Sequence, residues 1–277
     1  MDLLCSMDYN LLINESKTWR NMMNYTDLIF DLYGTLVDIH TEESEAVWEK
    51  VALFFGFYGA YYSGEALYEA FRSALAVRKA EAGQDYECYP DIPFEPIMSE
   101  LFEMKGITER SDLLGIQAAQ LFRILSIEYI RLYPKVPEAL TTLRNKGYRL
   151  WLLSNAQRIF TEYEIRHLKL EQYFDGIYLS SDFACRKPDI RFFKALLEEQ
   201  KLDPSRCLMI GNDRDTDISG AKHAGLSTLY MHTNLTPPDQ DEADPAMSPQ
   251  KTGSDCRHFE YEGCDWAELA QLIQTLS

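Results

Sequence analysis

The sequence predicts an α/β protein: a doubly wound, mostly parallel sheet with an all-helical domain inserted after the first strand. From residue 134 onward, short apolar segments typical of buried strands alternate with amphipathic segments of helical period. Between the first strand-like segment and this alternation lie roughly 90 residues with helical spacing alone. A chain of 277 residues is long enough to fold both a core and a second module.

The first expected strand lies in DLIFDLY, residues 27–33, because a short apolar run there is followed by turn residues. Four segments with helical spacing follow: 41–55, 63–82, 93–106 and 111–133. Residues before the strand are apolar without a clear period, so we treat them as a leader. The expected units are therefore a leader at 1–24, a core of 25–39 and 132–277, and a helical domain at 40–131.

The remaining elements alternate in type. Helices are expected at 136–147, 159–174, 188–201, 215–225 and 265–276, and strands at 148–156, 175–182, 206–213, 226–232 and 258–263. The stretch 233–256, rich in Pro, Asp and Ser, is expected to be a mobile loop. This alternation implies right-handed crossovers and a sheet whose ligands bind beyond the carboxyl ends of the strands.

Composition narrows the class of partner. The formal charge of −17 argues against nucleic acid, since it would repel a phosphate backbone. No run of about 18 apolar residues or signal-peptide pattern occurs, so we expect a cytoplasmic protein that neither spans nor binds a membrane. The six cysteines lack CxxC spacing and are expected to remain thiols. A small molecule is the expected partner, and the chain is expected to be a monomer or a homodimer.

Four of the expected strands end in or are followed by residues with chemical content. In chain order, these are Asp31; Ser154 and Asn155; Arg186, Lys187 and Pro188; and Gly211, Asn212 and Asp213. Singly, these residues could be strand-end caps, turns, a solvated lysine or a helix N-terminus. Together, at one edge of a parallel sheet, they indicate an electrostatic site.

The residue types suit phosphoryl transfer. Asp31 is the candidate nucleophile, and its attack on a phosphate dianion needs a cation to offset the repulsion. Oxygens from Asp31 and from Asn212, Asp213 or Asp217 would suit Mg²⁺, which takes a few protein ligands plus water. An aspartyl phosphate would form, and water would hydrolyse it.

Other groups would hold the phosphate. Lys187 would balance the charge of the nucleophile and the phosphate. The Ser154 hydroxyl and main-chain N–H groups near Gly34 and Thr35 would bind the non-bridging oxygens, with Asn155 close by.

Four motifs carry a family resemblance over most of residues 27–231: DLYGTL, LLSNA, RKPD and IGNDRDTDISGAKHAG. They resemble the motifs of the haloacid dehalogenase (HAD) superfamily of aspartate-nucleophile hydrolases. The resemblance implies a Rossmann-like, HAD-like core, with the helical insert as a cap that closes over the site and selects substrates. It also implies that in metal-dependent members the main-chain carbonyl at the position of Tyr33 binds the metal.

Tyr33 separates two enzymatic interpretations. Phosphatases of the family typically carry at this position a second aspartate that acts as general acid and base, a contribution commonly worth roughly 10² to 10⁴ in rate. The family's 2-haloacid dehalogenases carry tyrosine there, in DxYGT, because halide leaves without a proton. We interpret Tyr33 as giving its carbonyl to the metal and its side chain to the wall beneath the cap, which leaves protonation to water or a cap residue.

The fourth motif favours the phosphatase. Asp213, Asp215 and Asp217 supply oxygen donors, whereas the dehalogenases work without metal and have a less acidic segment there. The dehalogenases also share a cap arginine; Arg72 and Arg78 are candidates, although a solvated helix face is the favoured interpretation of both. We therefore expect a Mg²⁺-dependent phosphatase of a small phosphomonoester. The alternatives are a metal-independent 2-haloacid dehalogenase and a weakly active or non-catalytic binding module.

The aromatic segment FFGFYGAYY, residues 54–62, has three possible uses. Its rings could stack on a substrate, form a dimer surface, or pack the core of the cap, which is the favoured interpretation.

Overall fold

The computed structural model describes residues 24–82, 89–238 and 256–276. Nearly all of the expected leader and most of the expected mobile loop lie outside the described residues, as do Cys5 and Cys88. Within the described part of the chain, Cys185, Cys207, Cys256 and Cys264 are free thiols. None of the described helices is long and apolar enough to cross a membrane.

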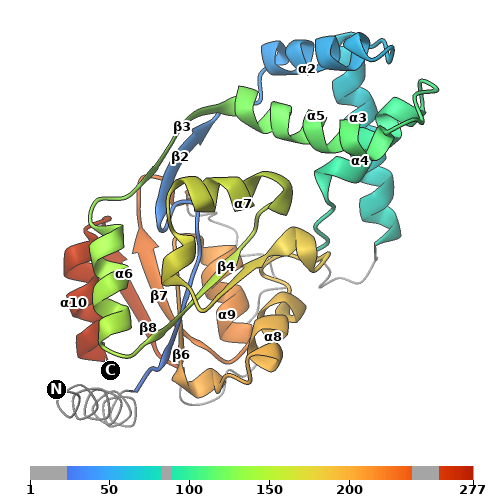
Figure 1. Ribbon diagram of the computed structural model, residues 1–277. Coiled ribbons are helices and arrows are strands. Elements are labelled where there is room, and N and C mark those ends of the chain that lie inside the picture. The colour runs from blue at the N-terminus through green and yellow to red at the C-terminus, as the bar shows by residue number, and fades with distance from the viewer. Residues whose placement is uncertain (1–23, 83–88, 239–255, 277) are drawn as a thin grey trace, which may run out of the picture.

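The core is a six-stranded sheet in the order β5-β4-β1-β6-β7-β8, and every neighbouring pair is parallel (Figure 1). Its strands are β1 (Asp27–Phe30), β4 (Arg149–Ser154), β5 (Gly176–Leu179), β6 (Cys207–Gly211), β7 (Ser227–His232) and β8 (His258–Glu262). Each lies within an expected strand segment. The predicted α/β fold class is therefore confirmed.

Helices cover both faces of the sheet because alternate strand residues point to opposite sides. Leu28 and Phe30 face a cluster that contains α6 (Val136–Asn145) and α10 (Trp266–Leu276). Ile29 faces the other cluster, built against α8 (Ile190–Glu199) and α9 (Gly220–His223). Figure 1 shows α6 and α10 together on one side of the sheet and α8 and α9 on the other. The sheet is therefore doubly wound, as predicted.

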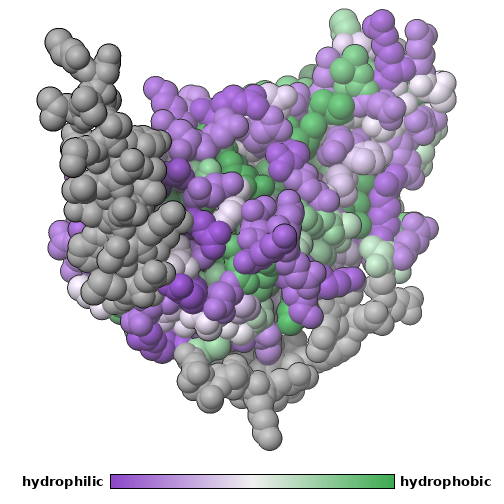
Figure 2. All heavy atoms as spheres, turned by 60° about the horizontal axis from the view of Figure 1, so that its bottom comes forward, coloured by the Kyte–Doolittle hydropathy of each residue, from purple (hydrophilic) through white to green (hydrophobic). Residues whose placement is uncertain are grey.

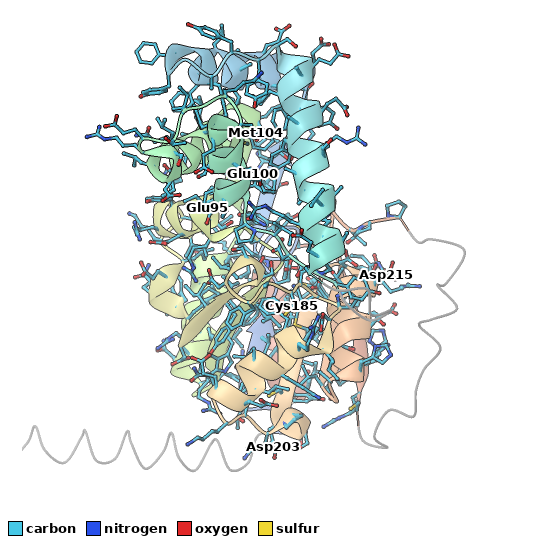
Figure 3. All side chains as sticks on the ribbon, turned by 90° about the vertical axis from the view of Figure 1, so that its right-hand side faces the viewer. Glu95, Glu100, Met104, Cys185, Asp203 and Asp215 are labelled. Carbon is cyan, nitrogen blue, oxygen red and sulfur yellow. The ribbon has the colours of Figure 1, made fainter. Side chains whose placement is uncertain are left out.

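The insert packs as a separate helical unit above the core (Figure 1). Its helices are α2 (Glu45–Phe57), α3 (Gly64–Glu81), α4 (Phe94–Glu103) and α5 (Ser111–Ser126). They share an apolar cluster of their own, in which Phe55 stacks on Phe102 with ring centroids 3.9 Å apart. Seen from the side in Figure 3, Glu95, Glu100 and Met104 follow one another along this unit away from the core, where Cys185 lies. We call this unit the cap.

The connection between cap and core differs from the prediction. We expected a helix over 111–133, but α5 ends at Ser126 and the chain continues as β3 (Ile127–Leu132). This strand pairs antiparallel with β2 (Val37–Thr41), which the sequence did not predict either. The helical prediction was wrong because the apolar spacing of IEYIRL suits both structures. Pairing with a distant strand, reinforced by the Arg131–Asp38 ion pair at 2.7 Å, decides between them.

Two predicted helices are shorter than expected. The segment 159–174 forms α7 (Arg158–His167), which ends before Lys169 takes a positive φ of 56°. The segment 215–225 begins as a wide π turn over Arg214–Ser219 and becomes α9 only at Gly220. In that turn the N–H groups of Asp217 and Ile218 share the Asp213 carbonyl, at 3.0 and 3.2 Å.

The chain carries a formal charge of −17. On the face shown in Figure 2, hydrophilic residues cover much of the area, and hydrophobic ones gather toward its centre and one upper corner. Large apolar side chains are exposed on the cap in particular: Phe57 is 82% exposed, Tyr61 76% and Leu53 74%.

Candidate active site

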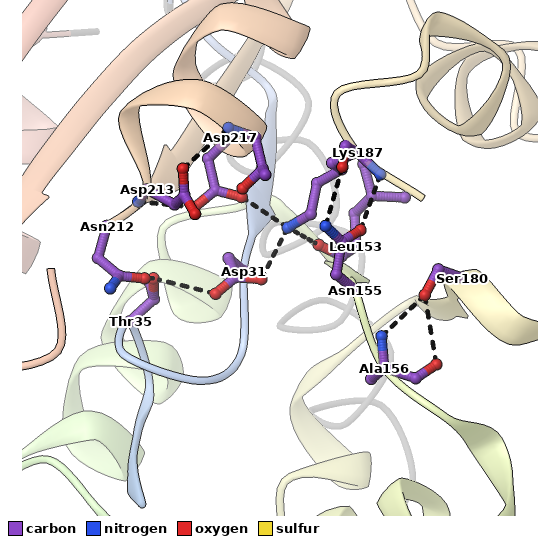
Figure 4. A network of polar contacts seen from close by, with 11 residues as sticks. Asp31, Thr35, Leu153, Asn155, Ala156, Ser180, Lys187, Asn212, Asp213 and Asp217 are labelled. Carbon is purple, nitrogen blue, oxygen red and sulfur yellow. Dashed lines mark hydrogen bonds and ion pairs between the residues drawn. The ribbon is translucent and has the colours of Figure 1, made fainter. Parts of the chain in front are cut away.

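The carboxyl edge of the sheet holds a buried lysine bound to two carboxylates (Figure 4). Asp31 follows β1, and its main-chain N–H donates to the Ile210 carbonyl of β6 at 3.0 Å. The Lys187 ammonium donates to Asp31 Oδ1 at 2.7 Å, to Asp217 Oδ1 at 2.6 Å and to the Leu153 carbonyl at 2.7 Å. All three donors of the ammonium are therefore used, and three strands converge on one cation. The Lys187 side chain is 1% exposed, which excludes the interpretation of this residue as a solvated surface lysine.

The charges of this cluster depend on one another. Burial alone would lower the pKa of Lys187, but the carboxylates of Asp217 and Asp31 outweigh it and raise that pKa, so the lysine stays charged. Burial also raises the pKa of the Asp217 carboxyl to about 7; Lys187 opposes this rise and the charge of Asp31 adds to it. One lysine thus faces two carboxylates, and the excess negative charge favours a further cation.

Main-chain bonds fix the position of Lys187. The side chain of Asn155, after β4, accepts from the Lys187 N–H at 2.7 Å and donates to the Lys187 carbonyl at 3.0 Å. The preceding residue, Ser154, is the last of β4 and is 1% exposed. The structure therefore brings the expected second and third motifs to one point.

The turn after β1 completes the edge. The Thr35 hydroxyl lies 3.4 Å from Asp31 Oδ2 and 3.2 Å from Asn212 Oδ1, so it links the first motif to the fourth. Gly34 has a φ of +83°, and a Cβ there would lie 2.3 Å from the Asn212 amide nitrogen. Only glycine allows both this backbone conformation and the close approach of Asn212.

Two aspartates of the acidic fourth motif, Asp217 and Asp213, have different roles. Asp217 points into the buried cluster, and its Oδ2 also accepts from the Asp213 N–H at 3.1 Å. Asp213 instead accepts from the N–H groups of Asp215 and Thr216, both at 2.9 Å, so it caps its own helical turn. Gly211 makes room for this arrangement, since a Cβ there would lie 2.3 Å from Asp217 Oδ2.

The donor set suits a hard cation. Within the described residues, no group of three or more His, Cys, Asp and Glu side chains is arranged as a metal site. The oxygens at this edge come instead from Asp31, Asp217, the Asn212 amide and main-chain carbonyls. Mg²⁺ accepts such a set, because it takes one or two carboxylates and completes its shell with water and substrate oxygens. The residues present therefore fit Mg²⁺.

The Tyr33 side chain points away from this cluster, toward the cap. Its hydroxyl donates to the Glu164 carboxylate and lies 3.0 Å from Thr161 Oγ1, both on α7. Glu164 also binds Arg123 of the cap helix α5, with N–O distances of 2.5 and 3.1 Å. Burial, reinforced by the charge of Glu164, raises the pKa of the Tyr33 phenol well above its usual range. Tyr33 thus belongs to a cluster, Tyr33–Thr161–Glu164–Arg123, that joins cap to core.

The sequence interpretation missed the partners of Tyr33. One signal was present: Arg123 is the single charge within the apolar stretch AAQLFRILS. The two candidate arginines, Arg72 and Arg78, lie elsewhere. Arg72 pairs with Glu69 on an exposed face, and Arg78 pairs with Glu100, so the solvated-face interpretation holds for Arg72 and neither lines the cavity described next.

A cavity of about 310 Å³ lies between cap and core. Its walls come from both units: Tyr33, Ile39, Thr41, Asp91, Arg123, Asn155, Ala156, Gln157, Phe160 and Arg186. Tyr33 thus forms part of the wall beneath the cap, as expected. No residue of the aromatic segment 54–62 is among these, and the buried rings of that segment pack within the cap.

A second junction closes the cavity on the side of the cap loop before α4. Asp91 accepts from the Ser180 hydroxyl and, at 2.8 Å, from the Gln157 amide. Gln157 also donates to the Ile92 carbonyl at 3.2 Å and accepts from the Phe94 N–H at 3.1 Å. Both clusters therefore join cap to core beside the cavity.

Comparison with known proteins fits this site. The model of the haloacid dehalogenase-like hydrolases matches residues 28–225, so the chain belongs to this family and the resemblance seen in its motifs is confirmed. A glyceraldehyde 3-phosphate phosphatase from Methanothermobacter thermautotrophicus is 32% identical over 115 residues, 42% of this chain and 51% of that protein. The chain thus spans about half the length of this curated relative.

Two solved structures share the fold. A HAD phosphatase from Thermococcus onnurineus has a TM-score of 0.52 and 18% identity, covering 90% of this chain and 97% of its own. A 2-haloacid dehalogenase from Pseudomonas syringae pv. Tomato DC3000 has a TM-score of 0.53 and 18% identity, covering 91% and 100%. Because the two differ in named activity, the fold does not choose between phosphatase and dehalogenase.

Proposed function

We propose that this chain is a Mg²⁺-dependent phosphatase of a small phosphomonoester and that it acts through an aspartyl phosphate on Asp31. The observation that carries the proposal is the buried cluster at the sheet edge, in which Lys187 lies within 2.7 Å of Asp31 and 2.6 Å of Asp217. The cluster holds all-oxygen donors and excess negative charge, which suits a divalent cation and, with it, a phosphate. The phosphatase named among the relatives supports the same reaction class.

Each group would have a defined task. Asp31 Oδ2, the oxygen not bound to Lys187, would attack phosphorus while the P–O bond to the leaving group breaks. Lys187 holds the other oxygen and fixes the direction of attack. The Thr35 and Ser154 hydroxyls and the N–H groups of the turn would bind the non-bridging oxygens. Water would then cleave the P–O bond to Asp31 and release inorganic phosphate.

Mg²⁺ would be held by Asp31, the Tyr33 carbonyl, Asn212 and Asp217, and would offset the charge of the phosphate as the carboxylate approaches it. Asp213 is a weaker candidate ligand, because its carboxylate caps its own helical turn.

The leaving group receives its proton from water in this scheme. The Tyr33 hydroxyl is bound to Glu164 and Thr161, and its raised pKa makes it a poor acid. We therefore expect phosphate esters with good leaving groups, such as aryl phosphates, to turn over faster than alkyl phosphates.

One observation favours the second candidate, a 2-haloacid dehalogenase. The site offers no acid at position 33, and halide needs none. In that reaction Asp31 would attack carbon, the carbon–halogen bond would break, and water would hydrolyse the resulting ester. The excess of carboxylates around Lys187 is the reason we place the phosphatase first.

The experiment compares Asp31→Asn with Asp215→Asn. Asp215 belongs to the acidic fourth motif, as Asp217 does, but it is exposed, and among the described residues no hydrogen bond or ion pair joins its side chain to the buried cluster. We expect Asp31→Asn to abolish phosphate release from p-nitrophenyl phosphate and Asp215→Asn to retain it, both proteins being folded by circular dichroism. Full activity of Asp31→Asn would contradict the proposal.

A further inference from the structure

We infer that Arg186 selects substrates that carry a carboxylate in addition to the phosphate, by binding that carboxylate in the cavity between cap and core. The inference rests on the proposed function, because it assumes that the phosphate sits at Asp31. It concerns a residue outside the buried cluster and names the chemical class of the substrate.

Apart from Thr41, the other polar side chains of the cavity wall are hydrogen-bonded within the protein. Arg123 is paired with Glu164, and Tyr33 donates to the same carboxylate. Gln157 uses its amide toward Asp91 and the main chain of the cap loop. Asn155 uses both ends of its amide on the main chain of Lys187. These groups shape the cavity and have little capacity left for a ligand.

Arg186 differs from all of them. Its main-chain N–H donates to the Tyr89 carbonyl of the cap loop at 2.9 Å, which holds the residue at the cavity wall. Its side chain is exposed and interacts with the Asp91 carboxylate through charge, but among residues 24–82, 89–238 and 256–276 no group hydrogen-bonds its guanidinium. It is adjacent in sequence to Lys187, which binds the nucleophile. The guanidinium thus lines the same cavity as Asn155, whose side chain binds the main chain of Lys187.

The matching ligand group accepts hydrogen bonds and carries negative charge. A guanidinium binds a carboxylate through two parallel N–H···O bonds, and no neutral group of similar size offers the same geometry. Asp91, the acid in the same wall, has its oxygens covered by Ser180 and Gln157. A cavity of about 310 Å³ suits a compact acid.

The test uses matched ligands and variants. The ligands are 2-phosphoglycolate, a minimal phosphomonoester with a carboxylate, and ethyl phosphate, which lacks it. The variants are Arg186→Gln, Arg186→Lys and, as a control for a lost surface charge, Arg72→Gln, whose side chain lies outside the cavity. We measure kcat and KM for each pair with Mg²⁺. Dissociation constants are measured by calorimetry in an Asp31→Asn background, which needs no turnover.

The expected result is a selective loss. Charge-assisted hydrogen bonds of this kind correspond to about 10-fold to 100-fold in affinity. Arg186→Gln should therefore weaken the binding of 2-phosphoglycolate by that factor, which appears mainly as a higher KM and Kd. The KM and Kd of ethyl phosphate should change by less than about threefold. Arg186→Lys should recover part of the loss, and Arg72→Gln should show none.

Equal losses on both ligands, no loss on either, or failure of the parent protein to prefer 2-phosphoglycolate would overturn the inference. Absence of phosphate release from every ester, including p-nitrophenyl phosphate, would instead overturn the proposed function. The binding measurement separates the two cases, because it reports on the role of Arg186 even where no ester turns over.

Discussion

Replacing Tyr33 by phenylalanine tests the assignment of its hydroxyl to the junction between cap and core. The change removes the oxygen that binds Glu164 and Thr161 and leaves the ring, over which Arg123 lies 5.6 Å from the centroid. Since Glu164 keeps two hydrogen bonds from Arg123, its carboxylate is not left unpaired.

The structure sets the size of both effects. Loss of one buried hydrogen bond to a charged group costs about 1.5 to 3 kcal/mol of folding stability. For a chain of this size each kcal/mol lowers the melting temperature by about 2 to 4 °C, so we expect a fall of roughly 3 to 12 °C. Turnover of ethyl phosphate should change by less than about threefold, because the hydroxyl donates to Glu164 and not to the substrate.

The assay measures kcat for ethyl phosphate and p-nitrophenyl phosphate, together with the melting temperature. Tyr163→Phe is the control, since Tyr163 is on the same helix and is 54% exposed. A general acid contributes roughly 10² to 10⁴ in rate. A fall of that size on ethyl phosphate, with p-nitrophenyl phosphate little changed, would show that Tyr33 is the acid and would refute the assignment.

Two further predictions concern position 33 and Asp38 of β2, the strand that pairs with β3 between cap and core. Tyr33→Asp should raise turnover of alkyl phosphates by supplying an acid, at a cost in melting temperature; unchanged or lower turnover in steady-state assays would contradict this. Burial alone would raise the pKa of Asp38, but hydrogen bonds from Asn234 and Arg131 outweigh it and lower that pKa. The resulting stabilisation is present above the ordinary carboxyl value of about 3.9 and is lost as pH falls through the lowered pKa. Asp38→Asn should therefore reduce the melting temperature near neutral pH and flatten its decline in acid; a curve parallel to that of the parent protein would count against this account.

The strands of the core could be predicted because each is a short apolar run bounded by turn residues. The meeting of Asp31, Lys187 and Asp217 followed from the topology, since parallel strands end at one edge. Local sequence could not show the antiparallel ribbon of β2 and β3. The apolar positions of IEYIRL continue the helical period of α5, and only pairing with residues 37–41 changes the outcome.

The partners of Tyr33 lay beyond prediction for a different reason. Glu164 is 131 residues away in sequence, and the cap places Arg123 against it. Nothing in the local pattern of DLYGTL indicates that its tyrosine would be bound by a carboxylate. The direction of this side chain, away from Asp31 and toward the cap, is decided by packing between two units.

Release of p-nitrophenolate from p-nitrophenyl phosphate and of chloride from 2-chloropropionate, each with Mg²⁺ and with EDTA, tests the proposed chemistry most directly. A carboxylate nucleophile beside an excess of negative charge predicts Mg²⁺-dependent release of the phenolate, a leaving group that hardly needs an acid, and no release of chloride. Chloride release that EDTA leaves unchanged, without phosphatase activity, would contradict the phosphatase assignment and show that Tyr33 marks a dehalogenase.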